Sequence, residues 1–150
     1  MEEFKIVIPG EPGVTVSEQR AAVWDNCRQK KCYVRIEFER QCEDIKFDGP
    51  ISVELEFYVT PPRDKMHEEL IGRQHDRLPH LSSLIRFITD AAKGILYRNE
   101  KTICSITAKK FFSINPRTEI VIYKKIECHD SMEKELEEYR NRPKRPSYYI

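Results

Sequence analysis

Residues 79–100 read PHLSSLIRFITDAAKGILYRNE, and this stretch carries the strongest structural signal in the chain. Its apolar side chains recur every three or four positions, which is the spacing of one helical face. They are Leu81, Leu84, Ile85, Ile88 and Ala92. Gly94 follows, where a glycine commonly ends a helix. The pattern therefore predicts a helix from about Leu81 to Lys93.

Strand patterns lie on both sides of this helix. Apolar and polar residues alternate from Ile51 to Val59, which predicts a half-buried strand. Two more strands are predicted at 102–112 and 117–126, and the Asn115-Pro116 turn between them favours a hairpin. A shorter strand is predicted at 3–8, just before a Pro-Gly turn.

The remaining segments give weaker signals. Residues 11–30 contain Pro and Gly with little periodicity, which favours an irregular loop. Helical spacing of apolar residues predicts a helix over 32–42, and the charged stretch 63–71 is predicted as a short helix. A final helix is predicted to start at Asp130 as its N-cap and to run through Tyr139.

Length and composition bound the class of protein. The chain has 150 residues, 39% hydrophobic and 34% charged, which suits one folded domain. No apolar run approaches the roughly 18 residues of a membrane span, and the acidic start lacks the basic region of an export signal. We expect a cytoplasmic α+β protein with a small mixed sheet and helices packed on it. Its domain should cover 1–128, followed by a C-terminal helix and basic tail over 129–150.

The five cysteines do not form a metal-binding or disulfide pattern. An odd number cannot all pair within one chain, and no two stand at the CxxC spacing of a zinc site. They are Cys27, Cys32, Cys42, Cys104 and Cys128. We expect reduced thiols that pack as small hydrophobic groups.

Several motifs share one frame: a strand ending in Pro61-Pro62, PHLSSLIR at 79–86, TDAAKGILYRNE at 89–100 and NPRTEI at 115–120. This frame resembles the RusA family of Holliday-junction resolvases. In that family the helix opens with Pro-Asp-Leu-Asp-Asn-Leu and continues through Leu-Asp-Ala-Leu-Asn-Gly. The resemblance extends to about Ile126. It implies a homodimer that binds four-way DNA junctions and, with magnesium, nicks paired strands.

The resemblance also implies where the catalytic carboxylates belong. The family's three acids align with His80, Ser82 and Glu100, so two of the three are absent here. Asp90 is a family-like acid on the helix with a less direct part. Magnesium prefers carboxylate oxygens, whereas serine is neutral and histidine suits transition metals better. Glu100 is therefore the remaining metal candidate, and we expect cleavage to be lost or weak.

Basic residues near this frame are candidate DNA contacts. Arg86 and Lys93 stand seven apart, nearly on one helical face with Ser82 and Thr89. The full set is Arg20, Lys30, Lys31, Arg86, Lys93, Lys109 and Lys110. The basic C-terminal stretch from Tyr139 suits either contact with a phosphate backbone or a frayed end. Net charge is only +1, which gives no whole-protein attraction to nucleic acid.

Three functions remain open at this stage. The first is a RusA-like homodimer that binds branched or duplex DNA without efficient cleavage, in recombination or repair of phage or other mobile DNA. The second is an active junction endonuclease with an altered metal site, built on Glu100, Asp90 and either Asp76 or His80. The third is a protein-interaction module that no longer binds DNA.

Overall fold

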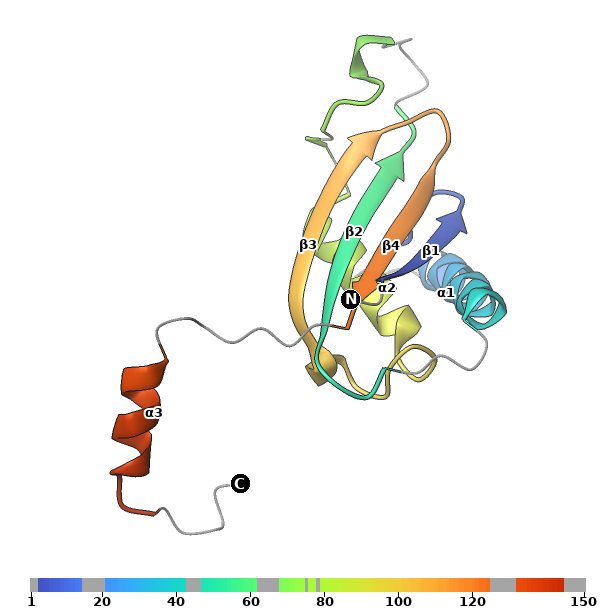
Figure 1. Ribbon diagram of the computed structural model, residues 1–150. Coiled ribbons are helices and arrows are strands. Elements are labelled where there is room, and N and C mark those ends of the chain that lie inside the picture. Colours follow the sequence, from blue (N-terminus) through green and yellow to red (C-terminus); the bar gives the residue numbers. More distant parts are fainter. Residues whose placement is uncertain are drawn as a thin grey trace.

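The computed structural model describes residues 3–14, 21–42, 47–61, 68–74, 76–77, 79–124 and 132–144, with the side chains of 21–27 excepted. The elements in chain order are β1 (Glu3–Pro9), α1 (Ala21–Gln41), β2 (Ile51–Val59), η1 (Glu68–Leu70), α2 (Leu81–Ala92), η2 (Glu100–Thr102), β3 (Ile103–Phe112), β4 (Arg117–Tyr123) and α3 (Glu133–Arg140). This mixed α+β architecture confirms the predicted fold class (Figure 1).

The four strands form one sheet in the order β1-β4-β2-β3. β2 and β3 pair in parallel, while β4 is antiparallel to both β1 and β2. A parallel pair needs a long crossover connection, and α2 provides it between β2 and β3. The sheet is therefore mixed, as predicted.

The predicted hairpin between the last two strands is wrong. β3 and β4 are consecutive in the chain, yet β2 lies between them and pairs with both. The turn at 113–116 carries the chain over the end of β2, where Ser113 N–H donates to the Val59 carbonyl at 2.9 Å. A turn between two strands does not determine whether those strands pair with each other. Here β3 and β4 instead flank β2, which buries both edges of β2 in the sheet.

The first helix was also misjudged. α1 begins at Ala21, so the predicted irregular loop over 11–30 is wrong in its second half, and the predicted helix at 32–42 is only the C-terminal part of α1. Among the side chains of α1 that the structure describes, from Arg28 onward, the buried ones are Val34 and Phe38. Good helix formers such as alanine and glutamine extend α1 toward its N-terminus. The apolar residues of that part have no helical spacing, so the sequence did not predict it.

Other predicted elements hold to different degrees. The strand at 51–59 is confirmed, as is the helix that begins at Leu81, which ends at Ala92 before Gly94 with its φ of +86°. The first strand is confirmed and one residue longer, but β4 ends at Tyr123. Of the helix predicted at 63–71 the structure describes only the short η1, and Asp130 lies outside the described residues.

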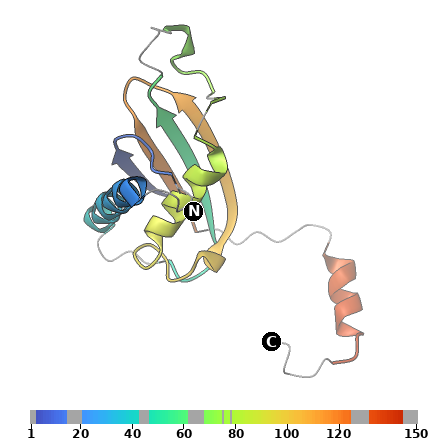
Figure 2. The ribbon, with the colours of Figure 1, turned by 180° about the vertical axis from the view of Figure 1, so that it is seen from behind.

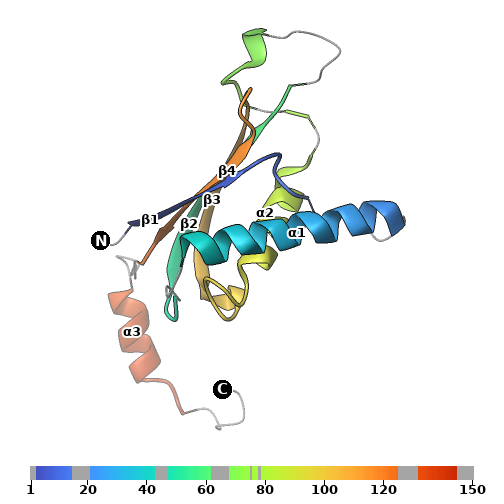
Figure 3. The same ribbon diagram turned by 90° about the vertical axis from the view of Figure 1, so that its right-hand side faces the viewer.

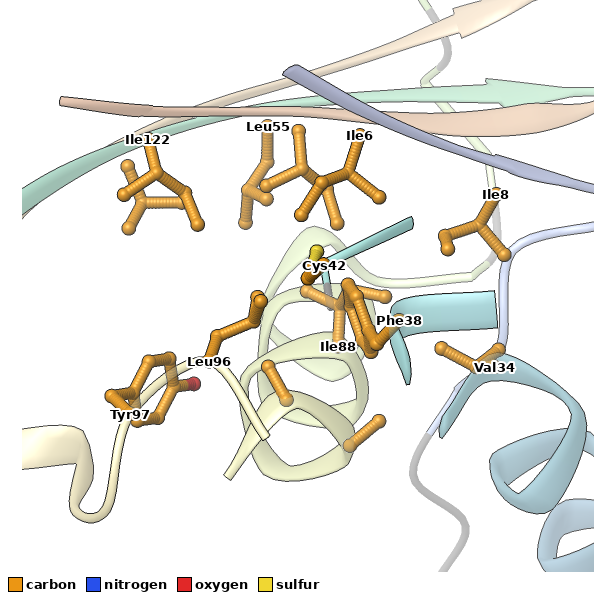
Figure 4. Close-up of a cluster of buried hydrophobic side chains, with 14 of the residues drawn as sticks. Ile6, Ile8, Val34, Phe38, Cys42, Leu55, Ile88, Leu96, Tyr97 and Ile122 are labelled. Carbon is orange, nitrogen blue, oxygen red and sulfur yellow. The ribbon is translucent and has the colours of Figure 1, made fainter. Parts of the chain in front are cut away.

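Both α1 and α2 cover the same face of the sheet, as Figures 2 and 3 show. The strands send alternate side chains into this layer, among them Ile6, Leu55 and Ile122, which point toward Phe38 and Ile88 of the helices (Figure 4). Burying such aliphatic and aromatic side chains stabilises the fold by about 1.5–3 kcal/mol each. The α1–sheet–α2 layer is therefore the single core.

Cys42 belongs to this core, and burial raises the pKa of its thiol to about 11. Cys32 and Cys104 are free but exposed, so the expectation that the cysteines pack as small hydrophobic groups is wrong for these two and holds for Cys42. Cys27 and Cys128 lie among the side chains that the structure does not describe.

The opposite face of the sheet is polar, and no described helix covers it. Arg117 stacks over the Tyr58 ring at 3.7 Å and its Nε donates to Glu119 at 3.1 Å. The Tyr123 hydroxyl donates to Glu54 at 3.2 Å. The Arg117–Tyr58 and Tyr123–Glu54 contacts join β4 to β2, and cross-strand pairs stabilise a solvent-facing sheet surface modestly.

A close contact in the core gives a first prediction. A Cβ at Gly13 would lie 2.2 Å from the Phe87 ring of α2, whereas a Cβ at Gly49 would meet nothing within 4 Å. Gly13→Ala should lower the free energy of unfolding by about 1–3 kcal/mol through overpacking. Gly49→Ala, the matched control, should change it by less than about 1 kcal/mol. Urea denaturation measures both, and equal effects would contradict the packing described here.

Candidate nucleic-acid interface

The N-terminal end of α2 carries two of the positions singled out from the sequence. His80 is the N-cap residue in extended conformation, with φ −66° and ψ 140°. Its carbonyl accepts from Ser83 N–H at 3.1 Å and Leu84 N–H at 3.2 Å, but its side chain makes no capping bond. Both His80 and Ser82 are exposed, and the first turn contains no acid. This helix end therefore presents its partial positive charge without an opposing carboxylate.

Lys110 holds the chain that leads into this helix end. Its Nζ donates to the Arg77 carbonyl at 2.6 Å and to the Pro79 carbonyl at 2.8 Å. An ammonium group has three donors, and two are used here on backbone. Lys110, which the sequence nominated for DNA contact, thus fixes the loop immediately before His80.

Two residues of α1 bind the C-terminal end of α2. Lys31 Nζ lies 2.5 Å from Asp90 Oδ2. Arg35 Nη1 donates to the carbonyls of Ala91 at 3.0 Å and Lys93 at 2.9 Å. The last carbonyls of a helix lack partners within the helix, so Arg35 satisfies two groups that would otherwise need water. Sequence analysis missed Arg35, because nothing local indicates that α1 would lie against this turn.

Tyr97 joins the turn after α2 to the helix. Its hydroxyl donates to the Thr89 carbonyl, and its ring is buried. Burial raises the pKa of Tyr97, and the charges of Glu100 and Asp90 raise it further. Both carboxylates therefore lie within electrostatic reach of this phenol, at the C-terminal end of α2.

This arrangement separates the predicted catalytic positions. His80 and Ser82 lie at the start of α2, whereas Asp90 and Glu100 lie at its far end. A helix of 12 residues is about 18 Å long at ~1.5 Å per residue. Within one chain the structure does not bring these four residues together.

The residues present do not fit a magnesium ion. Neither histidine nor serine supplies the carboxylate oxygens that magnesium prefers. Among the described residues no group of three or more His, Cys, Asp or Glu side chains could hold a metal. Asp76 is exposed in the loop before α2, and His75 lies outside the described residues.

The predicted DNA contacts are distributed over different surfaces. Arg86 is exposed on α2, but Lys93 is the extended C-cap residue just after the helix, so the two do not share a helical face as predicted; the Lys93 side chain is also exposed. Lys109 sits beside Glu56 on the polar face of the sheet, because strand alternation sends it opposite to Lys110. Lys30 is partly buried beside the Pro9-Gly10 turn, and this burial lowers its pKa, although Glu11 acts in the other direction. Arg20 lies outside the described residues.

Sequence analysis also passed over two cations near Glu100. Arg98 and Lys101 are exposed in the turn and in η2. Asn99 shapes this segment, since its side-chain oxygen accepts from Lys101 N–H at 3.1 Å. Together with Lys93, Arg98 and Lys101 make the segment that follows α2 basic, and Glu100 lies between Arg98 and Lys101 in the sequence. Arg98 and Lys101 stand within two residues of Glu100 in the sequence, so their closeness to this acid was predictable.

The sequence model of the endodeoxyribonuclease RusA family matches residues 4–123, which include all four strands, α1 and α2. The chain belongs to the RusA family. Members of this family are typically magnesium-dependent nucleases that act on Holliday junctions. α3 lies beyond the matched range.

A curated protein is similar to this chain over most of its length. The uncharacterized protein YqaN of Bacillus subtilis (strain 168) is 19% identical over 125 residues, covering 77% of this chain and 88% of that protein.

Within the part of this RusA-family chain that the structure describes, no helix is long and apolar enough to cross a membrane.

The Arg35 contacts give a second prediction. Arg35→Met keeps much of the aliphatic stem but removes both bonds to the α2 carbonyls, so the free energy of unfolding should fall by about 1–3 kcal/mol. Arg28→Met changes an exposed arginine on the same helix and should cost less than about 0.5 kcal/mol. Thermal and urea unfolding compare the two. Equal losses would show that Arg35 contributes no more than a surface arginine.

Proposed function

We propose that this RusA-family protein is a homodimer that binds four-way or duplex DNA through the exposed side of α2, with cleavage lost or weak. One observation carries the proposal: the family frame is kept, while the N-terminal end of α2 has His80 and Ser82 where the family has acids. We place its action in the cytoplasm, in recombination or repair of phage or other mobile DNA.

Electrostatics support binding along α2. Arg86 is exposed on the helix and Lys93 just after its end, while Asp90, the acid between them in sequence, is paired with Lys31. No carboxylate stands in the first turn to repel a phosphate. Phosphate contacts by exposed cations supply most of the affinity of such proteins for DNA. The absence of two acids therefore favours binding even as it disfavours catalysis.

Weak cleavage follows from the chemistry of the same positions. Hydrolysis of a phosphodiester needs a polarised phosphate and an activated water, which the family obtains from a metal held by carboxylates. Glu100 is the one aligned acid that remains, and it lies at the far end of α2 from Ser82. A single exposed carboxylate is a poor ligand set for magnesium.

We further propose that residues 129–150 form a separate tail beyond the DNA-binding domain of 1–128. Every residue of α3 is exposed, and the helix stands clear of the sheet in Figures 1 and 3. A tail with this basic end would add salt-sensitive affinity for DNA without contributing to the core.

Junction binding is the direct test. A gel-shift titration with a labelled four-way junction and a matched linear duplex should give a shift that weakens steeply as salt rises. The double change Arg86→Gln with Lys93→Gln should lower affinity about tenfold and reduce the salt slope by about one per lost phosphate contact.

Lys109→Gln is the matched control, because it removes one cation from the opposite face of the sheet. It should leave affinity nearly unchanged. If Lys109→Gln weakens binding as much as the α2 changes do, DNA does not approach along α2. If the wild type gives no shift at all, DNA binding is lost and a protein partner becomes the leading function.

Cleavage is tested on the same labelled junction in EDTA, magnesium and manganese. We expect the junction to remain intact in every case. Metal-dependent nicks that disappear in Glu100→Ala would contradict this and identify an active endonuclease with a rebuilt metal site. Nicks that persist in Glu100→Ala would point to a contaminating nuclease.

A protein-interaction role has one observation in its favour. The side of α1 that faces away from the sheet exposes Tyr33 at 40% and Ile36 at 61%, next to Cys32. Exposed apolar residues that gather on one helix face often mark contact surfaces. This surface is separate from α2, so a partner there is compatible with DNA binding.

A further inference from the structure

The outer side of α1 carries apolar residues that the core does not use. Tyr33 is 40% exposed and Ile36 is 61% exposed, and Cys32 beside them is exposed as well. Together with Arg28 and Gln29, these three side chains line a groove along the helix. An apolar groove of this kind suits the apolar face of another helix.

α3 has an apolar stripe on a helix that is too short to be stable by itself. Met132, its N-cap residue, and Leu136 and Tyr139 recur at the i, i+4, i+7 spacing of one helical face. They are 42%, 50% and 73% exposed. Isolated helices of fewer than about 12 residues are marginal in water, and α3 has eight. This helix therefore needs a surface on which its stripe can be buried.

The charges of the two helices are opposite in sign. Residues 28–36 of α1 contain four cations and no acid, whereas residues 133–140 contain four acids and two cations. The first turn of α3 carries Glu133 and Glu135, and the last turn of α1 carries Arg40. These two ends meet when the helices run antiparallel. Charge complementarity of this kind selects an acidic helix as the occupant of the groove.

The chain between β4 and α3 is long enough to reach α1. Tyr123 pairs with Glu3, and Val7, four residues further along β1, is hydrogen-bonded to Gln41, the last residue of α1. Four strand residues span about 13 Å. Eight residues separate Tyr123 from Met132, and a chain of eight residues spans at most about 29 Å. The start of α3 can therefore lie at the C-terminal end of α1.

We propose that α3 docks in the groove of α1 of its own chain, antiparallel to α1. In this orientation Leu136 packs against Tyr33 and Ile36, and Tyr139 lies beside Cys32. A short tether gives an effective concentration in the millimolar range, which favours the chain's own α3 over that of a second copy. Figure 1 shows the undocked arrangement, in which α3 is clear of the sheet.

Docking regulates access to the groove. A protein partner that binds the outer side of α1 must first displace α3, so α3 acts as a built-in competitor for this surface. The docked helix adds no side chain to the α1–sheet–α2 core, and the basic residues after Arg140 stay outside the groove. Docking requires no DNA, so it is independent of the function proposed above.

The reactivity of Cys32 tests whether α3 covers the groove. Maleimide labelling of the full chain is followed for each cysteine by mass spectrometry of its peptides. Leu136→Gln should raise the labelling rate of Cys32 about tenfold, because the central apolar contact of α3 is lost. Glu138→Gln, which changes a residue off the apolar stripe, is the matched control and should leave the rate unchanged. Cys104, which is exposed on β3, provides an internal reference whose rate should be the same in all three proteins.

The reciprocal change is made on α1. Ile36→Gln should speed cleavage of α3 by a glutamate-specific protease about tenfold, because the undocked helix is open to the enzyme. Ile114→Gln is the matched control, since Ile114 is 73% exposed in the turn between β3 and β4 and lies outside the groove. It should be cleaved like wild type. Circular dichroism of both variants checks that the fold is retained.

Cross-linking tests the orientation and the identity of the occupant. Tyr139→Cys and Met132→Cys are made in a background in which Cys27, Cys104 and Cys128 are serine, and each is treated with a short bis-maleimide. Tyr139→Cys should be joined to Cys32 at least several times faster than Met132→Cys, and the product should have the mass of one chain.

Three results would overturn the proposal. The first is a Cys32 labelling rate that is equal in wild type and Leu136→Gln. The second is faster cross-linking of Met132→Cys than of Tyr139→Cys, which excludes the antiparallel orientation. The third is a cross-linked product of two chains, or protection of Cys32 that grows with protein concentration, which makes a second copy the occupant. Each of these leaves DNA binding through α2 untouched, and loss of the junction shift leaves the docking of α3 untouched.

Discussion

The parallel pairing of β2 with β3 is the constraint on which the rest of this structure depends. Two parallel neighbours cannot be joined by a tight turn, so the chain must cross the sheet in between. α2 makes that crossing and packs its apolar stripe on the sheet, beside α1. Because β3 occupies one side of β2, β4 must take the other side, and β3 is left as an edge. Core, edge and site geometry all follow from this one pairing.

The same crossing sets the chemistry of the site. α2 starts at one end of the sheet and finishes at the other, so positions that lie 20 residues apart in sequence, His80 and Glu100, are separated by the length of the helix. The chain belongs to the RusA family, and the resemblance aligns two of the family's acids with His80 and Ser82. Binding of a phosphate backbone and hydrolysis of it make opposite demands on those positions, since carboxylates hold a metal but repel the phosphate when no metal is bound.

Several cations prove to be structural rather than free. Lys31 pairs with Asp90, Arg35 binds the last carbonyls of α2, and Lys110 binds the carbonyls before His80. Each fixes one end of the same helix, and together they determine how Arg86 on α2 and Lys93 just after it are placed. An inventory of lysines and arginines cannot distinguish these roles, because both kinds of residue look alike in a sequence. The distinction matters for the proposed DNA contact, since an exposed cation could reach a phosphate without first breaking an internal bond.

The sequence by itself determined the local elements whose period is strong. Alternation along 51–59 and the helical stripe beginning at Leu81 are properties of contiguous residues, so β2 and α2 were predicted nearly to the residue. The positions of His80, Ser82 and Glu100 as site candidates came from the resemblance to the RusA family and not from any period in the sequence. Tertiary structure alone decided that β4 pairs with β2 instead of β3, that α1 extends back to Ala21, and that Arg35 binds the last carbonyls of α2. Those outcomes depend on which surfaces are buried together, and burial is settled by contacts between residues far apart in the chain, for which no local pattern exists.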